Sequence, residues 1–155
     1  MKKTGFTLIE ILIVIAIFAL IILVAAPLTG SWVSDANRLE AEAQLTQAIG
    51  RAKAAALRNH GAATGDNPVT AVCLSGNNEL TIREGTDAAA PNCDPAAGTE
   101  LWQVQINKNV TVQNFSCLCF TNKGLLTNDG ACSSCSTTTE FSLTAGGESV
   151  PVTLY

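Results

Sequence analysis

One apolar stretch near the start of the chain limits how the chain can fold. The 21 residues from Phe6 to Ala26 carry no charge except at Glu10. About 20 apolar residues in a helix are enough to span a bilayer. An ionised carboxylate in hydrocarbon is strongly unfavourable unless it is neutralised or paired. The sequence therefore predicts a helix buried in lipid or among other helices, and it predicts that another molecule supplies the partner of Glu10.

The charges and cysteines on either side of this stretch indicate where each end lies. Lys2 and Lys3 precede it, and all six cysteines follow it. This arrangement suits a cytoplasmic N-terminus and an exported, oxidising C-terminal part. Without the two lysines, 7 basic residues face 13 acidic ones, a net charge of −6. Such an acidic balance argues against a nucleic-acid-binding protein.

Two ordinary explanations of the apolar stretch fit poorly. A secretory signal peptide has an apolar core of about 7–15 residues and a small-residue cut site after it. Here the stretch is longer, contains Glu10, and has its small residue, Gly5, in front. A plain membrane anchor explains the length of the stretch and leaves Glu10 unexplained.

The sequence KKTG followed by FTLIE, at residues 2–10, resembles the class III signal of type IV prepilins and type II secretion pseudopilins. The resemblance implies that a prepilin peptidase cuts between Gly5 and Phe6 and that the new N-terminus, Phe6, is methylated. The apolar helix then stays attached to the mature chain. The resemblance also implies that Glu10 neutralises the amine of Phe6 in a neighbouring subunit of a filament.

The helical pattern runs from about Phe6 to His60 and contains Pro27. Proline lacks an N–H and clashes with the carbonyl four residues earlier, so we expect a kink or local melting between Leu23 and Pro27. Many pilins have proline here, where the helix loosens in assembled fibres, so Pro27 is expected to serve assembly. A tolerated kink without a role in assembly is the alternative.

The second half of the predicted helix is amphipathic. Ser34 or Asp35 could cap it locally, and the sequence Asn59-His60-Gly61 indicates its end. Apolar residues recur on one side at helical spacing, namely Leu45, Ile49, Ala52 and Ala56. This side is expected to pack closely on a sheet.

After Gly61 the pattern changes to short alternating runs separated by turn residues. The segment 85–98 reads as a loop, and Pro151 places the last strand at a sheet edge. The expected strands are 69–74, 79–84, 101–106, 110–112, 117–120, 140–144 and 149–155. We predict an α+β, type IV pilin-like fold in which a long helix packs on a small antiparallel β-sheet head. Its parts are a cleaved leader 1–5, a transmembrane and assembly helix 6–28, an amphipathic half 29–60 and a disulfide-bonded head 61–155.

A second resemblance covers most of the chain with looser motifs. LTQAIGRAKAAALRN, followed by PVTAVCL, resembles the helix end and first strand of the GspH/FimT/FimU group of minor pilins and pseudopilins. CFTNKGLLTNDG, with Gly124, and EFSLTAGGESVPVTLY resemble the later strands of that group.

The cysteines allow three interpretations: disulfides, a zinc site, or a redox Cys-x-x-Cys. The exported location and the even number favour disulfides. If 117–120 is a strand, Cys117 and Cys119 share one face about 7 Å apart, too far for easy mutual bonding. Each would then reach Cys132 or Cys135, and Cys73 would pair with Cys93.

No catalytic motif stands out, and the single histidine, His60, reads as a helix-end residue. We therefore expect no enzyme, no cofactor, no metal and no small-molecule substrate. The expected function is that of a minor type IV pilin that helps to prime or cap the pilus. Alternatives are a GspH-like pseudopilin of a type II secretion system, a major pilin, and a DNA-uptake minor pilin. The last is disfavoured because no basic residue follows Lys123.

Expected partners are other pilin subunits and the prepilin peptidase. The chain is expected in the inner membrane as a single-pass protein with a periplasmic head, and afterwards in a pilus or pseudopilus filament.

Overall fold

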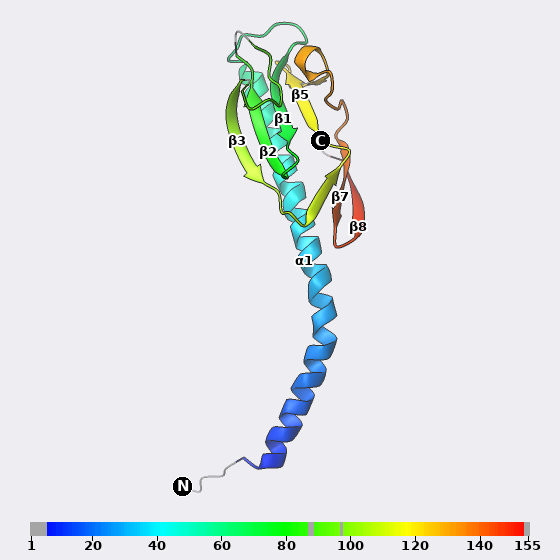
Figure 1. Ribbon diagram of the computed structural model, residues 1–155. Helices are drawn as coiled ribbons and strands as arrows, with labels where there is room; N and C mark the ends of the chain where they lie inside the picture. Colours follow the sequence, from blue (N-terminus) through cyan, green and yellow to red (C-terminus); the bar gives the residue numbers. More distant parts are fainter. Residues whose placement is uncertain (1–5, 87–88, 97, 154–155) are drawn as a thin grey trace, which may run out of the picture.

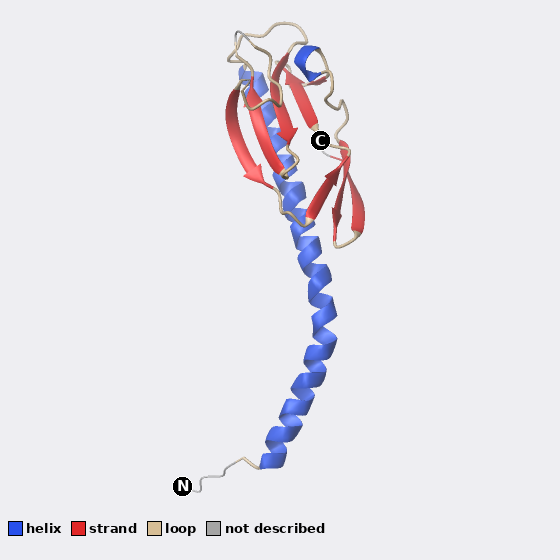
Figure 2. Ribbon diagram, in the orientation of Figure 1, coloured by secondary structure: helices blue, strands red, loops and turns tan. Residues whose placement is uncertain are grey.

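A single long helix carries a β-rich head on its C-terminal half (Figure 1). The computed structural model describes residues 6–86, 89–96 and 98–153. Helix α1 spans Leu8–Arg58 and its lower half extends away from the head. Figure 2 shows the strands gathered beside the upper part of this helix. The predicted α+β, pilin-like layout is confirmed, and the helix bounds differ from the expected 6–60 by two residues at each end.

Helix α1 is continuous through Pro27, so the expected local melting is not found. The helix instead curves gently along its length (Figure 1). The expected local capping by Ser34 or Asp35 is also wrong. The Ser34 hydroxyl donates to the Gly30 carbonyl at 3.2 Å, and Asp35 pairs with Arg38 at 3.3 Å. Because the helix is not interrupted there, its backbone N–H groups leave no orphan donors for a cap.

The helix ends where the sequence indicated, at Asn59. This residue adopts the left-handed conformation, with φ +46°. Its side-chain amide donates to the Ala63 carbonyl and its side-chain oxygen accepts from the Ala63 N–H, both at 2.9 Å. Asparagine tolerates this conformation better than most residues. Asn59 therefore stops α1 and turns the chain towards the first strand.

The head contains two antiparallel sheets, whereas a single sheet was expected. The larger has the order β3-β2-β1-β5-β6 and the smaller β4-β7-β8. The first comprises β1 (Pro68–Leu74), β2 (Glu79–Glu84), β3 (Thr99–Gln105), β5 (Cys117–Thr121) and β6 (Leu126–Thr127). The second comprises β4 (Val110–Gln113), β7 (Glu140–Ala145) and β8 (Glu148–Thr153). A short 3₁₀ helix, η1, spans Gly130–Cys132.

The division into two sheets follows from strand pairing. Strand β5 pairs with the distant β1, so β4 is left to pair with β7. Between β4 and β5 the chain turns at Asn114, which has a positive φ of +62°. Strand β8, which contains Pro151, lies at the edge of its sheet as predicted.

One face of the larger sheet packs on α1. The predicted apolar stripe of the helix is buried, with Leu45, Ala52 and Ala56 at 0% exposure. The alanines allow a close approach, because the Thr70 hydroxyl of β1 donates to the Ala52 carbonyl of α1 at 3.1 Å. Across this contact lie the buried side chains of the strands, namely Val72, Leu80, Ile82, Leu118 and Phe120.

The opposite face of the larger sheet carries a second, cysteine-rich cluster. Its buried members are Ala71, Cys73, Cys117, Cys119 and Cys132. They lie under the segments that follow β2 and β6, so the disulfides serve as the packing layer that a second helix would otherwise supply.

The β7–β8 hairpin tip rests on the helix at Ser34. A Cβ atom added at Gly146 would lie 2.6 Å from the Ser34 hydroxyl oxygen and 2.9 Å from the Ser34 Cβ. Nearby, the Asn107 side-chain amide donates to the Asn37 side-chain oxygen at 3.0 Å. These contacts seat the lower edge of the head on the helix.

The contact between the β7–β8 hairpin tip and Ser34 can be tested by substituting two adjacent glycines. Both Gly146 and Gly147 have positive φ, but a Cβ at Gly147 would meet nothing within 4 Å. Gly147→Ala should lose about 1 kcal/mol of stability through backbone strain alone. Gly146→Ala should lose a further 1–3 kcal/mol or so, because the added methyl group overpacks against Ser34. Thermal unfolding in detergent measures both, and equal shifts in Tm would show that the hairpin does not press on Ser34.

Candidate functional site

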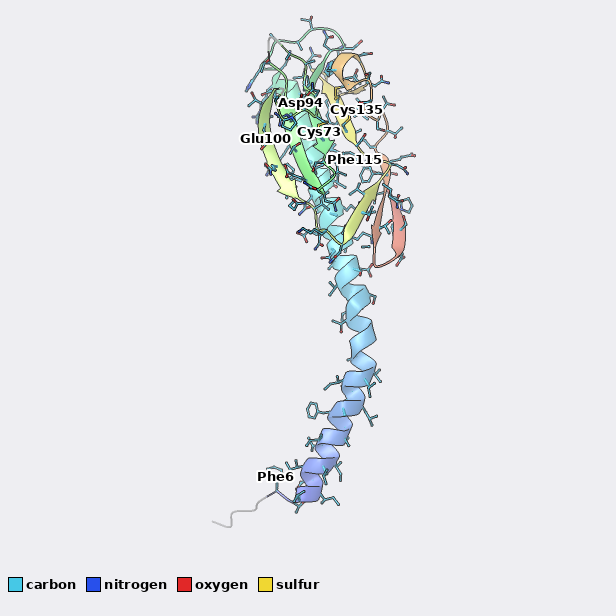
Figure 3. All side chains as sticks on the ribbon, in the orientation of Figure 1. Phe6, Cys73, Asp94, Glu100, Phe115 and Cys135 are labelled. Atoms are coloured by element: carbon cyan, nitrogen blue, oxygen red, sulfur yellow. A yellow bond between two sulfur atoms is a disulfide. The ribbon has the colours of Figure 1, made fainter. Side chains whose placement is uncertain are left out.

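The lower half of α1 is a long apolar surface that the head does not cover. Its large side chains are exposed, with Leu8 at 81% exposure, and Phe6, just before the helix, is 82% exposed. In Figure 3 they project from the helix in every direction, with Phe6 at its lower end. By length and composition, Leu8–Ala25 could cross a membrane, and no part of it is buried by the residues that the structure describes. A surface of this kind must be covered by lipid or by other helices.

Glu10 lies in the first turn of this helix and has a local partner. Thr7 is the N-cap: its hydroxyl accepts from the Glu10 N–H at 3.4 Å, and the Glu10 carboxylate accepts from the Thr7 N–H at 3.4 Å. This reciprocal pair is a capping box, which satisfies two orphan N–H groups of the helix end. The carboxylate also lies at the positive end of the helix dipole.

The analysis of the sequence missed the capping box although its signal is present. Thr7 and Glu10 have the spacing Thr-x-x-Glu in front of an apolar run, which is the usual signature. Glu10 thus has a role within its own chain. Its pairing with the Phe6 amine of a neighbouring subunit stays a prediction.

The sequence also singled out the cleavage residues Gly5 and Phe6 and the assembly residue Pro27. Gly5, before the predicted cut, lies outside the described residues, and Phe6 is the first described residue. Pro27 lies within the continuous α1, between the exposed apolar segment and the part that carries the head.

The comparisons with known proteins bear on this end of the chain. A family model described as the prokaryotic N-terminal methylation motif matches residues 1–26. The chain carries a class III prepilin signal. This signal, with the long helix and antiparallel head, is consistent with the type IV pilin and pseudopilin superfamily. It implies processing by a prepilin peptidase, assembly with other pilins in general, and membrane anchoring before assembly. No curated protein and no solved structure matches the chain.

The head is cross-linked by three disulfides. They join Cys73 to Cys93, Cys117 to Cys135 and Cys119 to Cys132. Cys117 and Cys119 lie on one face of β5, and each bonds across to the segment that follows β6. The sequence had left open which of the two bonds Cys132. Figure 3 shows Cys73 and Cys135 in the upper part of the head.

The sulfur atoms of Cys119, Cys132 and Cys135 lie within 4.8 Å of one another, as a zinc site would require. Zinc binds the thiolate form of cysteine. In this structure each of these sulfur atoms is bonded to another sulfur atom. The arrangement thus serves as a covalent link between β5 and the segment around η1.

A second anchor holds the segment after β2. Cys93 ties this segment to β1, and the buried Arg83 donates to the Pro95 carbonyl at 2.7 Å. Arg83 also pairs with Glu100 at 3.4 Å. A covalent bond and a charged hydrogen bond are thus among the contacts that hold the long loop.

His60 lies just past the end of α1, as expected. Its imidazole is exposed, and Nδ1 lies 3.6 Å from the carboxylate of the buried Glu84. This contact links the end of the helix to strand β2.

Proposed function

We propose that this protein is a minor type IV pilin that helps to prime or cap the pilus. The observation that carries the proposal is the apolar segment Leu8–Ala25, which has no cover within the described part of the chain and lies within the matched prepilin motif, residues 1–26. A segment of this kind fits a helical bundle of similar subunits, and the attached head then reaches the filament surface.

The proposed mechanism begins in the inner membrane. The helix 6–28 holds the precursor as a single-pass protein with its head in the periplasm. The prepilin peptidase removes residues 1–5 and methylates Phe6. The helix then moves from lipid into the bundle, where other apolar helices replace the acyl chains around it.

In the bundle the carboxylate of Glu10 neutralises the amine of Phe6 in a neighbouring subunit. Both groups have lost their water there, so each is the natural partner of the other. The capping box of Thr7 and Glu10 supports this arrangement, because it places the carboxylate at the helix start, close in sequence to Phe6.

The head makes the lateral contacts with other subunits, and its cross-links keep it folded outside the cell. Three disulfides in a small domain suit a subunit that stands outside the cell. A GspH-like pseudopilin, which would drive secretion of folded proteins, is the alternative, because the looser resemblance of the head covers both kinds of protein.

A clean deletion in the source organism distinguishes the two functions. Surface pili and secreted enzymes are scored in the same strains, with the wild-type chain and a cleavage-blocked Gly5 variant as complementing controls. Loss of pili with normal secretion, restored only by the wild-type chain, is the expected result. Normal pili with enzymes trapped in the periplasm would instead identify a pseudopilin.

A further inference from the structure

Two of the three disulfides lie side by side at strand β5. Cys117 bonds to Cys135, and Cys119 bonds to Cys132. The Sγ atoms of Cys119 and Cys135, which are not bonded to each other, lie 3.7 Å apart. A disulfide bond is about 2 Å long, so an approach of about 1.7 Å would join these two atoms. One sulfur atom of each bridge thus lies within a small movement of the other bridge.

The two bridges differ in their access to solvent. Both cysteines of the Cys119–Cys132 bridge are 0% exposed. Cys135, in contrast, is half-buried and directly follows two exposed serines. A thiolate of another molecule must reach a sulfur atom in order to attack a disulfide. Such a thiolate can reach the Cys117–Cys135 bridge at Cys135, whereas the inner bridge, Cys119–Cys132, is shielded.

The structure also contains an acceptor for a thiol at Cys132. The Sγ atom of Cys132 lies 3.5 Å from the carbonyl oxygen of Pro91, in the loop that follows β2. A sulfur atom in a disulfide carries no hydrogen, so this contact is not a hydrogen bond in the oxidised chain. A free thiol at Cys132 would donate its S–H to that oxygen. The buried position of Cys132 therefore suits a neutral thiol as well as a disulfide.

We propose that β5 and the segment around η1 form a site of thiol–disulfide exchange, at which a dithiol enters through Cys135. The reactant is of the class of the reduced Cys-x-x-Cys of a thiol oxidoreductase. One of its thiolates attacks the Sγ of Cys135, and the Cys117 thiolate leaves. The second thiolate then attacks its own sulfur partner in this mixed disulfide. The reactant leaves as a disulfide, and its two electrons and two protons remain on the chain as thiols at Cys117 and Cys135.

The second stage is an exchange within the chain. The Cys135 thiolate attacks the Sγ of Cys119, the Cys119–Cys132 bond breaks, and the sulfur atom of Cys132 takes up the proton that Cys135 has lost. This stage involves no net oxidation or reduction. Its product has a Cys119–Cys135 bridge and thiols at Cys117 and Cys132. A disulfide joins β5 to the segment around η1 throughout, so the head stays cross-linked there while one bridge is reduced.

Two matched variants test the exchange, because both lack the outer bridge. Cys117→Ser leaves a thiol at Cys135, close to Cys119. Cys135→Ser instead leaves a thiol at Cys117, which lies about 7 Å from its neighbour on the same face of β5. The full-length variants are purified in detergent, acidified to stop exchange, unfolded and labelled with a maleimide at mildly acidic pH. The label on Cys132 should be about tenfold or more higher in Cys117→Ser than in Cys135→Ser.

A measurement on the wild-type chain needs no substitution. The chain is treated with one equivalent of dithiothreitol and sampled over time with the same acid quench and label. The tryptic peptides 109–123 and 124–155 each hold two of the four cysteines, and fragmentation locates the label within each. Labels should appear first at Cys117 and Cys135. The label at Cys135 should then fall while the label at Cys132 rises, and the label at Cys117 should persist.

Several results would overturn the inference, which does not depend on the type of filament that the chain enters. Labels that stay at Cys117 and Cys135 would show that no exchange follows reduction. A label at Cys119 in place of Cys132 would show that Cys135 attacks the wrong sulfur atom and bridges to Cys132. Equal labelling of Cys132 in the two variants would show that exchange does not need Cys135. Labels confined to the third bridge would show that the dithiol does not enter here.

Discussion

Replacing Glu10 by alanine is expected to lower incorporation into filaments about a hundredfold or more. In a bundle of apolar helices, loss of the carboxylate would leave the ammonium group of a neighbouring Phe6 without a partner. Breaking one side of a buried ion pair costs about 3–5 kcal/mol, and each 1.4 kcal/mol or so is a factor of ten. The measurement is the ratio of the chain in sheared filaments to the chain in membranes.

The structure shows why alanine alone cannot decide the cause. Glu10 also caps its own helix through Thr7, and alanine removes both functions. Glutamine at N3 can still complete a capping box, but it carries no charge. Glu10→Gln should therefore lose nearly as much incorporation as Glu10→Ala if pairing with the Phe6 amine is the main role.

Thr7→Ala is the complementary variant. It removes the N-cap hydroxyl that accepts from the Glu10 N–H and leaves the carboxylate in place. Loss of an N-cap costs about 1 kcal/mol, so incorporation should fall several-fold at most. Intact mass must show that all three variants start at Phe6, which excludes failed cleavage as the cause. Wild-type incorporation of Glu10→Gln would mean that Glu10 acts through capping alone.

Much of the fold can be predicted from local sequence patterns. The charge-free run around Glu10, the recurrence of Leu45 and Ala52, and the stop at Asn59 define α1 almost to the residue. Alternation likewise identifies the strands, for example β3, in which Trp102 and Val104 are partly buried and their neighbours are exposed. Local patterns suffice here because each reflects one side of an element facing a core.

The features that were missed depend on long-range pairing. The sequence pattern of residues 110–113 does not specify whether β4 pairs with β7 or with β5. The second sheet could therefore not be predicted. Strand β6 has only two residues, too few for any alternation to be read. The cap expected at Asp35 failed because tertiary packing keeps the helix continuous there. At the candidate site, the Thr7–Glu10 capping box could have been predicted from the sequence. The disulfide pairing could not, because Cys117 and Cys119 share a face and each could have bonded to Cys132 or to Cys135.

The pairing found in the structure changes what the disulfides are expected to contribute. Cys119 and Cys132 have 0% exposure and lie within the cysteine-rich packing layer, whereas Cys93 is exposed in the long loop. The loop that Cys93 holds is also tied down by the hydrogen bond from Arg83 to the Pro95 carbonyl. The Cys119–Cys132 bridge is therefore buried at both ends. The Cys73–Cys93 bridge has one exposed end, and the Arg83 hydrogen bond also holds its loop.

Removing the Cys119–Cys132 bridge is expected to destabilise the head more than removing the Cys73–Cys93 bridge. Loop closure alone predicts about 3 kcal/mol for either, slightly more for Cys73–Cys93, because its separation is 20 residues against 13. The double variant Cys119→Ala/Cys132→Ala should lose a further 1–2 kcal/mol or so, because it leaves a cavity in the packing layer. Chemical unfolding of the two double variants in detergent, with Tm as a second readout, measures the difference.

Mass spectrometry provides the control for this comparison. The wild-type chain should gain about 6 Da on reduction and each double variant about 4 Da, which shows that the remaining bridges have formed. If the Cys73–Cys93 variant proved the less stable, restriction of the unfolded chain would be the main contribution of a bridge to stability. With the expected order, burial in the layer opposite α1 decides how much each bridge stabilises the head. The cysteines would then act as the second core of the sheet as well as its cross-links.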